Sequence, residues 1–261
     1  MKEYVLITGA SSGIGAHLAM TFAESSYSLL LLARRENLLQ EVKEKCLKIN
    51  SKIRVETFCA DVRQDEDLKK VDNFIHKNDI ALKIVIANAG FGVMGKAEKL
   101  TLDDYKNQFD TNVFGLLRTF YIFKDHLKKS KGHLALMGSI SSYLGTPTLT
   151  PYCMSKFAVR AFAEGIFFEM KSFGVKCTLI CPGLVESQIR FVNNKGQYNP
   201  NAKDPAPKWI IVDTKSATAK MKKAILKGKK EIIITGHGKL MVFLQRHFPK
   251  LLDIFYSLRK L

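Results

Sequence analysis

The sequence lacks the features that mark several large classes of protein. It contains no run of about 18 apolar residues, so no transmembrane helix is predicted. The N-terminus enters the apolar run Tyr4–Ile7 without a charged region and a cleavable segment, so no secretory signal is expected. The 5 cysteines form no C-x-x-C pair, so neither a disulfide framework nor any metal site is predicted. Together these absences make a reducing cytoplasm the expected location.

Acidic residues are scarce, because 24 Asp and Glu stand against 41 Lys and Arg, a net charge of +17. The excess is uneven: residues 188–261 hold 16 basic and 4 acidic side chains. Such a balance suggests an anionic partner, either nucleic acid, anionic lipid or an acidic small molecule. No zinc pattern or aromatic RNA-binding signature accompanies the charge, so specific nucleic-acid binding is not expected. The chain has 261 residues with 46% apolar side chains, which is ordinary for one globular α/β domain.

Short apolar runs alternate with longer helical patterns along the chain. The runs are apolar at consecutive positions, which is typical of strands covered on both faces of a parallel sheet. The sequence therefore predicts one Rossmann-type, doubly wound α/β domain with seven strands and helices on both faces. The expected strands are Tyr4–Ile7, Ser28–Ala33, Ile53–Cys59, Ile84–Ala87, His133–Met137, Lys176–Cys181 and Glu231–Thr235. The expected helices are 14–25, 36–49, 65–77, 103–128, 152–172 and 214–227, with caps at Asp103 and Asp213 and ends at Gly174 and Gly228.

A glycine-rich turn follows the first strand. Its glycines, Gly9, Gly13 and Gly15, have the spacing G-x-x-x-G-x-G. We expect Gly9 to turn the chain, Gly13 to admit a pyrophosphate at the helix N-terminus, and Gly15 to let the helix approach the sheet. No Lys-Ser/Thr pair follows, which disfavours an ATP-type phosphate loop. The turn therefore favours a dinucleotide.

Two arginines follow the second strand, where dinucleotide folds commonly carry an acid for the ribose 2′-hydroxyl. Arg34 and Arg35 stand there instead. Guanidinium groups suit a phosphate, so NADP is favoured over NAD. The alternative is that both arginines are merely exposed at the start of the next helix.

Four polar residues have the properties of a proton-transfer site. Tyr152 and Lys156 are four positions apart on a predicted helix and share one face. A nearby ammonium would lower the pKa of the phenol, which could then exchange a proton with a carbonyl or alcohol. Ser139 follows a strand at the edge where ligands bind. Asn112 interrupts a predicted helix, and its apolar neighbours allow it to face inward.

Taken in order, these motifs resemble those of the short-chain dehydrogenase/reductase family over nearly all of residues 3–235. The resemblance implies an NADP(H)-dependent oxidoreductase that interconverts a carbonyl and an alcohol. It implies that Tyr152 donates the proton, that Ser139 holds the oxygen, that Lys156 binds the nicotinamide ribose, and that Asn112 holds a water. The implied cofactor-binding residues are Thr8, Gly9, Ser11, Ser12, Gly13, Ile14, Gly15, Arg34, Arg35, Asp61, Val62, Asn88, Ala89, Gly90, Tyr152, Lys156, Pro182, Gly183, Val185 and Ser187. A non-catalytic NADP-binding sensor of the same fold is the alternative function.

The segment 184–212 is expected to be a substrate lid, since it is long, irregular and largely apolar. A hydrophobic carbonyl substrate is therefore predicted. The residues expected around the carbonyl are Phe91, Gly92, Ile140, Tyr143 and Leu144, together with the apolar lid residues Leu184, Ile189, Phe191, Val192, Tyr198, Trp209 and Ile210. Trp209 could equally pack on the base of the lid. The resemblance also implies a homodimer or homotetramer that pairs through the helices 103–128 and 152–172.

Residues 236–261 form a basic extension beyond the family core of residues 1–235. The Gly236-His237-Gly238 sequence is expected to break the chain, followed by two short helices separated by Pro249. In the second helix an apolar stripe is predicted. Three interpretations of the stripe remain open: it packs on the fold or on a second subunit, it lies in an anionic membrane surface through 240–261, or it binds an acidic ligand. The second would place the protein at the inner face of a membrane. The stripe consists of Leu251, Ile254, Phe255 and Leu258.

Overall fold

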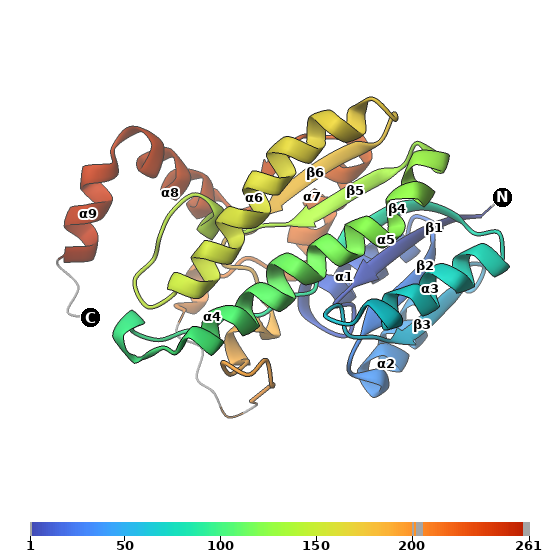
Figure 1. Ribbon diagram of the computed structural model, residues 1–261, viewed down its shortest axis with the longest axis horizontal. Coiled ribbons are helices and arrows are strands. Elements are labelled where there is room, and N and C mark those ends of the chain that lie inside the picture. The colour runs from blue at the N-terminus through green and yellow to red at the C-terminus, as the bar shows by residue number, and fades with distance from the viewer. Residues whose placement is uncertain (1, 200, 202–205, 258–261) are drawn as a thin grey trace.

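The structure is a computed structural model that describes residues 2–199, 201 and 206–257. Seven strands form one sheet in the order β3-β2-β1-β4-β5-β6-β7, with every neighbouring pair parallel (Figure 1). This confirms the predicted doubly wound sheet. The strands are β1 (Glu3–Thr8), β2 (Ser28–Ala33), β3 (Val55–Cys59), β4 (Ala81–Ala87), β5 (His133–Met137), β6 (Lys176–Cys181) and β7 (Glu231–Ile233).

Helices cover both faces of the sheet and enclose two separate apolar cores. One core contains Leu6 and Leu30, and the other contains their neighbours Val5 and Leu29. Successive side chains of a strand point to opposite faces, so a strand buried on both faces must be apolar at every position. The first core lies under α3 (Asp65–Lys77), α5 (Gly115–Ser130) and α6 (Thr150–Lys171), and the second under α1 (Gly13–Ala23), α2 (Glu36–Ile49) and α7 (Thr214–Lys227).

The long helix expected over 103–128 is divided in two. α4 (Leu102–Phe109) passes into a π-helical turn at Asp110–Phe114 before α5 begins. The cap of α4 is Thr101, whose hydroxyl and backbone N–H form a reciprocal capping box with Asp104, so the expected cap at Asp103 is wrong. Asp213 caps α7 as predicted, by accepting from the backbone N–H of Ser216 at 2.8 Å.

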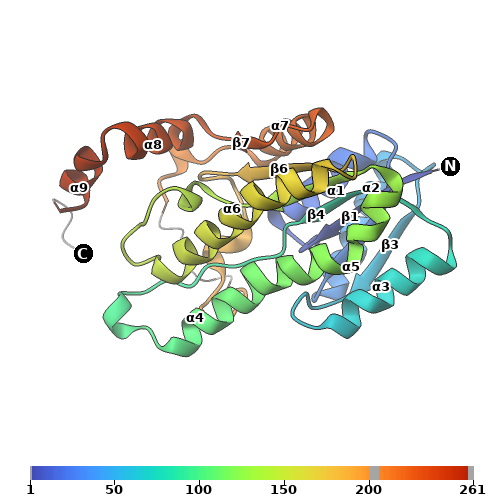
Figure 2. The same ribbon diagram turned by 45° about the horizontal axis from the view of Figure 1, so that its top comes forward.

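The C-terminal segment begins differently from the expectation. The Gly236-His237-Gly238 sequence does not break the chain: it forms the first turn of α8 (Gly236–His247), with Thr235 as the cap. Pro249 starts α9 (Pro249–Ser257), where its missing N–H has no helical partner to lose. Both views show α8 and α9 extending away from the sheet (Figure 2).

Only part of this segment packs on the rest of the chain. Val242 of α8 joins the first core, and Leu252 of α9 is buried. By contrast, Leu251 and Ile254 of the predicted stripe are more than half exposed. Leu258 lies outside the described residues, and so does the rest of 258–261. Within the described part, no helix has the length and apolarity that crossing a bilayer requires.

The positive charge of residues 188–261 is concentrated on α7 and the turn after it rather than on α8 and α9. Lys222 of α7 donates to the carbonyl of Thr21 and the hydroxyl of Ser25, which ties α7 to the end of α1. The basic residues of α7 and the turn after it are Lys215, Lys220, Lys222, Lys223, Lys227, Lys229 and Lys230.

All 5 cysteines are free thiols.

Candidate active site

The glycine-rich turn leads from β1 into α1 at the carboxyl edge of the sheet. Gly9 and Gly13 have φ of +68° and +54°, a backbone conformation that favours glycine. A Cβ on Gly15 would overlap the carbonyl oxygen of Gly9, so only glycine lets α1 start this close to the strand. Ser12 is the N-cap of α1, but its side chain makes no capping bond to the helix. Ile14 packs against the core beneath the turn.

The segment after β4 lies directly against this turn. The hydroxyl of Thr8 accepts from the backbone N–H groups of Asn88 at 3.0 Å and Ala89 at 3.1 Å. The side-chain amide of Asn88 donates in return to the carbonyls of Thr8 at 2.9 Å and Gly9 at 3.3 Å. The predicted residues Thr8, Gly9, Asn88 and Ala89 therefore form one hydrogen-bonded unit across the ends of β1 and β4.

Arg35 reaches from the end of β2 to the glycine-rich turn. Its guanidinium donates to the hydroxyls of Ser11 at 3.2 Å and Ser12 at 2.5 Å, and to the side-chain oxygen of Gln188 at 3.2 Å. Burial, with Arg34 as a second cause, lowers the pKa of this half-buried group. Arg34 is exposed and donates to the carbonyl of Gly196 at 3.1 Å. Two adjacent guanidinium groups thus border the turn, an arrangement that fits a phosphate.

Asp61 is engaged by a neighbouring arginine. Its carboxylate accepts from Nε of Arg63 at 3.0 Å and from Nη2 at 2.5 Å. Burial alone would raise the pKa of Asp61, but the hydrogen bonds and the charge of Arg63 outweigh it and lower the pKa. Val62 is buried, and a Cβ on Gly115 would lie 2.6 Å from its methyl group. The glycine that opens α5 therefore makes room for Val62.

Tyr152, Ser139 and Lys156 meet at the carboxyl end of β5. Ser139 follows this strand and lies within hydrogen-bonding reach of the Tyr152 hydroxyl. Lys156, one turn along α6, is 4% exposed and donates to the carbonyl of Met137 at 2.7 Å. Its Nζ lies 5.7 Å from the centre of the Tyr152 ring. On the other side, a Cβ on Gly92 would lie 3.6 Å from that ring.

The electrostatics of this trio differ from the expectation that Lys156 lowers the pKa of Tyr152. Burial raises the pKa of Tyr152 to about 12, and the hydrogen bond with Ser139 opposes this shift. Burial likewise lowers the pKa of Lys156 to about 8. The physical reason is that both groups lose hydration, which disfavours the charged form of each. Tyr152 is therefore held as a neutral phenol, a proton donor rather than a phenolate.

Asn112 lies in the π-helical turn and faces inward, as predicted. It is 1% exposed, and its amide donates to the carbonyl of Phe91 at 3.0 Å and the hydroxyl of Ser155 at 3.2 Å. Its side-chain oxygen accepts from the backbone N–H of Phe91 at 3.1 Å. A Cβ on Gly90 would lie 3.0 Å from the same oxygen. Asn112 thus links the loop after β4 to α6, beside Tyr152 and Lys156.

The turn after β6 is held by a histidine that the sequence did not single out. The backbone N–H of Leu184 donates to Nε2 of His237 at 2.9 Å, so this nitrogen is an acceptor. Burial lowers the pKa of His237, which favours the neutral ring. A Cβ on Gly183 would overlap both His237 and the hydroxyl of Thr235. The carbonyl of Pro182 accepts from the N–H of Ile140 at 2.9 Å, which ties this turn to the Ser139 loop.

The predicted lid joins the body at a narrow neck. Val185 forms a β-bridge with Val212. The backbone N–H of Glu186 donates to the carbonyl of Val212 at 3.0 Å, and the N–H of Val212 donates to the carbonyl of Leu184 at 2.9 Å. Farther out, the side chain of Asn194 bonds to the backbone of Met94 in both directions, at 3.0 and 2.9 Å. Ser187 lies against the glycine-rich turn, since a Cβ on Gly13 would stand 3.2 Å from its Cβ.

Two of the residues expected near the carbonyl, Trp209 and Tyr143, differ in their exposure. Trp209 is 85% exposed, so it does not pack on the described part of the lid base. Tyr143 is buried, but its hydroxyl accepts from the thiol of Cys181 at 3.6 Å, and its ring lies 4.3 Å from the guanidinium of Arg160. Phe91 and Leu144 are buried, and Ile140 is half-buried.

Gln108 is a second positioning residue without a sequence signal. It is completely buried, and its side chain bonds to the carbonyl of Phe91 at 2.8 Å and the N–H of Val93 at 2.7 Å. A polar residue on an amphipathic helix gives no sign of being buried, so only the fold identifies it. Together, Gln108 and Asn112 fix the loop that faces Tyr152.

Comparisons with known proteins identify the family of this chain. Residues 3–197 match the family model described as short chain dehydrogenase. The chain is 28% identical to a "Dehydrogenase/reductase SDR family protein 7-like" of Dictyostelium discoideum, over 97% of this chain and 80% of that protein. It is 32% identical to "11-beta-hydroxysteroid dehydrogenase-like 4A" of Arabidopsis thaliana, over 87% of this chain and 73% of that protein.

Two solved structures have the same fold. A short-chain dehydrogenase/reductase from Burkholderia phymatum in complex with NAD has a TM-score of 0.83 at 20% identity, covering 96% of this chain and 95% of that one. A short-chain dehydrogenase from Sphingobium yanoikuyae in complex with NADPH has a TM-score of 0.80 at 21% identity, covering 99% and 97%. The two neighbours were solved with different nicotinamide cofactors. From its matching family model, its fold and its relatives, this chain belongs to the short-chain dehydrogenase family, whose members are nicotinamide-dependent oxidoreductases acting on alcohol and carbonyl groups.

Proposed function

We propose that this protein is an NADP(H)-dependent oxidoreductase that interconverts a hydrophobic carbonyl compound and its alcohol. The observation that carries the proposal is the meeting of Tyr152, Ser139 and Lys156 beside Gly92. These residues stand at the carboxyl edge of a parallel sheet, where such folds bind their ligands. The glycine-rich turn and the two arginines lie at the same edge.

The residues divide the work of proton transfer. The Tyr152 phenol donates its proton to the carbonyl oxygen, and the hydroxyl of Ser139 donates a hydrogen bond that holds this oxygen in place. Lys156, whose Nζ lies 5.7 Å from the centre of the Tyr152 ring, would bind the ribose of the nicotinamide beside the reacting oxygen. Asn112 and Gln108 keep the loop at Phe91 against the site. The nicotinamide, when bound, supplies the hydride to the carbonyl carbon.

The preference for NADP is supported by the end of β2. No acid stands there to bind a 2′-hydroxyl, whereas Arg35 is fixed beside Ser11 and Ser12. Serine hydroxyls and a guanidinium are together suited to a phosphate monoester, because both donate hydrogen bonds and the arginine adds charge. Gly9 and Gly13 leave room for the pyrophosphate at the start of α1.

A hydrophobic substrate is supported by the apolar residues expected around the carbonyl and in the lid. Phe91 and Leu144 are buried, and the lid begins with Leu184 and Val185. The Arabidopsis relative is named as a hydroxysteroid dehydrogenase, and a steroid ketone is a carbonyl on a large apolar ring system. In an assay of NADPH absorbance, turnover should be faster with ring or long-chain ketones than with small polar ones. The reverse preference would contradict this part of the proposal.

Tyr152→Phe tests the function itself. The variant keeps the ring but has no proton to give, so turnover should be lost while NADPH binding, measured by fluorescence, stays unchanged. A non-catalytic NADP sensor predicts no turnover for the wild type either. The complete trio argues against such a sensor, because binding a cofactor does not require a proton donor. Undiminished turnover by Tyr152→Phe would refute the mechanism.

Self-association is proposed through α5 and α6, which run side by side across one face of the sheet (Figure 1). This face exposes aromatic side chains that a monomer would leave in water: Tyr121 is 58% exposed, Phe168 64% and Phe173 49%. A second copy of the chain that covered the same face would bury them.

Peripheral contact with an anionic membrane is proposed for the C-terminal helices. Leu240, Phe243, Leu251 and Ile254 are each more than half exposed on α8 and α9. Basic residues such as Lys239 and Lys250 accompany them, the combination that favours anionic lipid. The full chain should float with vesicles that contain phosphatidylserine, and Phe243→Glu should abolish flotation. Absence of flotation by the wild type would rule this out.

A further inference from the structure

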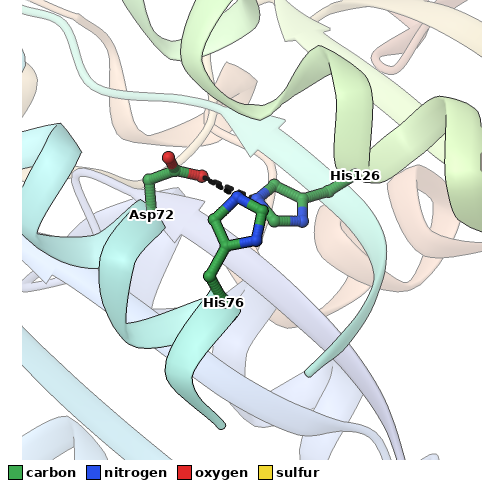
Figure 3. A group of neighbouring side chains, drawn as sticks. All are labelled: Asp72, His76 and His126. Atoms are coloured by element: carbon green, nitrogen blue, oxygen red, sulfur yellow. Dashed lines mark hydrogen bonds and ion pairs between the residues drawn. The ribbon is translucent and has the colours of Figure 1, made fainter. Parts of the chain in front are cut away.

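Two histidines and an aspartate converge between α3 and α5 (Figure 3). Asp72 and His76 are one turn apart on α3 and share a face, and His126 faces them from α5. Oδ1 of Asp72 lies 2.6 Å from Nε2 of His126 and 3.6 Å from Nε2 of His76. The two imidazole rings are tilted at 47° with their centres 4.6 Å apart.

This cluster is separate from the candidate active site. All three residues stand in the second halves of their helices. In a parallel α/β fold the helices run opposite to the strands, so these halves lie toward the amino edge of the sheet. Tyr152 and the glycine-rich turn lie at the carboxyl edge. No part of the proposed reaction uses Asp72, His76 or His126.

The distances among the donor atoms are close to those of a metal site. All three atoms lie within 4.8 Å of one another. In a tetrahedral complex with bonds of about 2.0–2.1 Å, the donor atoms stand roughly 3.3 Å apart. The 2.6 Å distance between the donor atoms of Asp72 and His126 therefore has to lengthen on metal binding, and the largest distance, at most 4.8 Å, has to shorten. Each change is no more than about 1.5 Å. The His76 side chain is 69% exposed and has room to rotate, whereas that of His126 is 10% exposed and fixed by packing.

We propose that Asp72, His76 and His126 bind a divalent transition-metal ion of the zinc type, with water as the fourth ligand. Two imidazole nitrogens and one carboxylate oxygen suit Zn²⁺ or Co²⁺, whereas Mg²⁺ and Ca²⁺ prefer oxygen alone. His76 also lies in the last turn of α3, where the helix dipole favours a cation. The metal takes the place of the hydrogen between Nε2 of His126 and Oδ1 of Asp72, and the neutral imidazole of His126 carries its proton on Nδ1 instead.

The ion would join α3 to α5 and would bind the folded chain only. The sequence predicts no metal site, because Asp72 and His126 are 54 positions apart and form no local motif. Binding to the folded state alone raises the melting temperature. At about a hundred-fold excess over Kd, the expected rise is roughly 5–10 °C for a chain of this size.

The test is a titration of the full-length chain with CoCl₂ after treatment with a chelator and desalting. It uses a Cys59→Ser background, because Cys59 is an exposed thiol that could also bind metal. One equivalent should bind and give the visible absorption of tetrahedral Co²⁺, which ZnCl₂ then displaces. His76→Gln and His126→Gln should each weaken binding at least about ten-fold, since each removes one of three protein ligands.

His247→Gln is the matched control, because His247 is exposed on α8, away from the cluster. It should bind Co²⁺ as the parent does. His76→Gln removes a largely exposed side chain, so it should fold and keep its turnover. The proposal is overturned if the parent chain binds no Co²⁺, or if neither histidine variant of the cluster weakens binding. In that event Asp72, His76 and His126 form only an ion-pair cluster.

Discussion

Replacing Arg35 by alanine should weaken the binding of NADPH much more than that of NADH. In the structure the guanidinium is half-buried and fixed by Ser11, Ser12 and Gln188, so its position changes little when a phosphate arrives. A hydrogen bond to a charged group contributes about 1.5–3 kcal/mol. At 1.4 kcal/mol per factor of ten, the loss amounts to roughly 10- to 150-fold in Kd for NADPH.

NADH has no 2′-phosphate, so Arg35→Ala removes no bond to it. Any loss of NADH binding comes from the hydroxyls of Ser11 and Ser12, which lose the side chain that holds them. Arg34→Ala should act in the same direction but more weakly, because Arg34 is exposed. A pair of exposed charges contributes about 0.2–1 kcal/mol, which predicts a loss for NADPH of up to about five-fold.

The assay is quenching of intrinsic fluorescence by each cofactor, at constant ionic strength because salt screens exposed charges. The quantity to compare is the ratio of Kd for NADH to Kd for NADPH in the parent and in each variant. The ratio should fall by at least about ten-fold in Arg35→Ala. Equal losses for both cofactors would refute the assignment of this site to a 2′-phosphate and would leave NAD as the natural cofactor.

Three further predictions concern pH and assembly. Burial lowers the pKa of His133 to about 4, so only the unfolded chain takes up this proton as pH falls from 6.5; stability should be lost between pH 6.5 and 4, by about 3 kcal/mol. In urea titrations, His133→Leu should reduce this loss of stability, whereas His247→Leu, at an exposed position, should not. Identical pH dependence of stability in the wild type and both variants would exclude the effect. Burial holds the pKa of Tyr152 near 12 and that of Lys156 near 8, so carbonyl reduction should be constant between about pH 6 and 7 and should fall above pH 8, where Lys156 loses its charge; reduction that fell with a midpoint near 6 would contradict this. Phe168→Glu should convert an oligomer to a monomer in light scattering, since it puts a charge on the α5–α6 face, whereas a wild type that is already monomeric would end the proposal.

The sheet could be predicted from the sequence because its strands carry their burial in their composition. β2 is apolar from Leu29 to Ala33 with no alternation, which only a strand covered on both faces requires. The capped end of α7 was equally predictable, since Asp213 and Gly228 mark its limits. The residues of the trio were identified by their order along the chain, and their meeting at one point follows from the parallel topology.

Other features depend on contacts between distant segments and have no local signal. The π-helical turn exists where Asn112 bonds to Phe91 and Ser155, and a helix pattern cannot show such a break. The pKa of Tyr152 depends on its burial, which spacing from Lys156 does not reveal. His237 reaches the turn after β6 only because α8 starts immediately at Gly236, where the sequence suggested a break.

The narrow neck of the lid has a consequence for how this protein could evolve. Val185 and Val212 pair where the segment leaves and rejoins the body, so the chain between them is a loop whose ends are held together. Lengthening such a loop costs little free energy, since the closure entropy grows only slowly with its length. Insertions between Gly196 and Val212 would leave the sheet and Tyr152 unchanged, whereas Ser187 and Gln188 contact the glycine-rich turn and Arg35 and belong to the framework of the site. The lid can therefore diverge, and with it the choice of substrate, while the catalytic framework stays under separate selection.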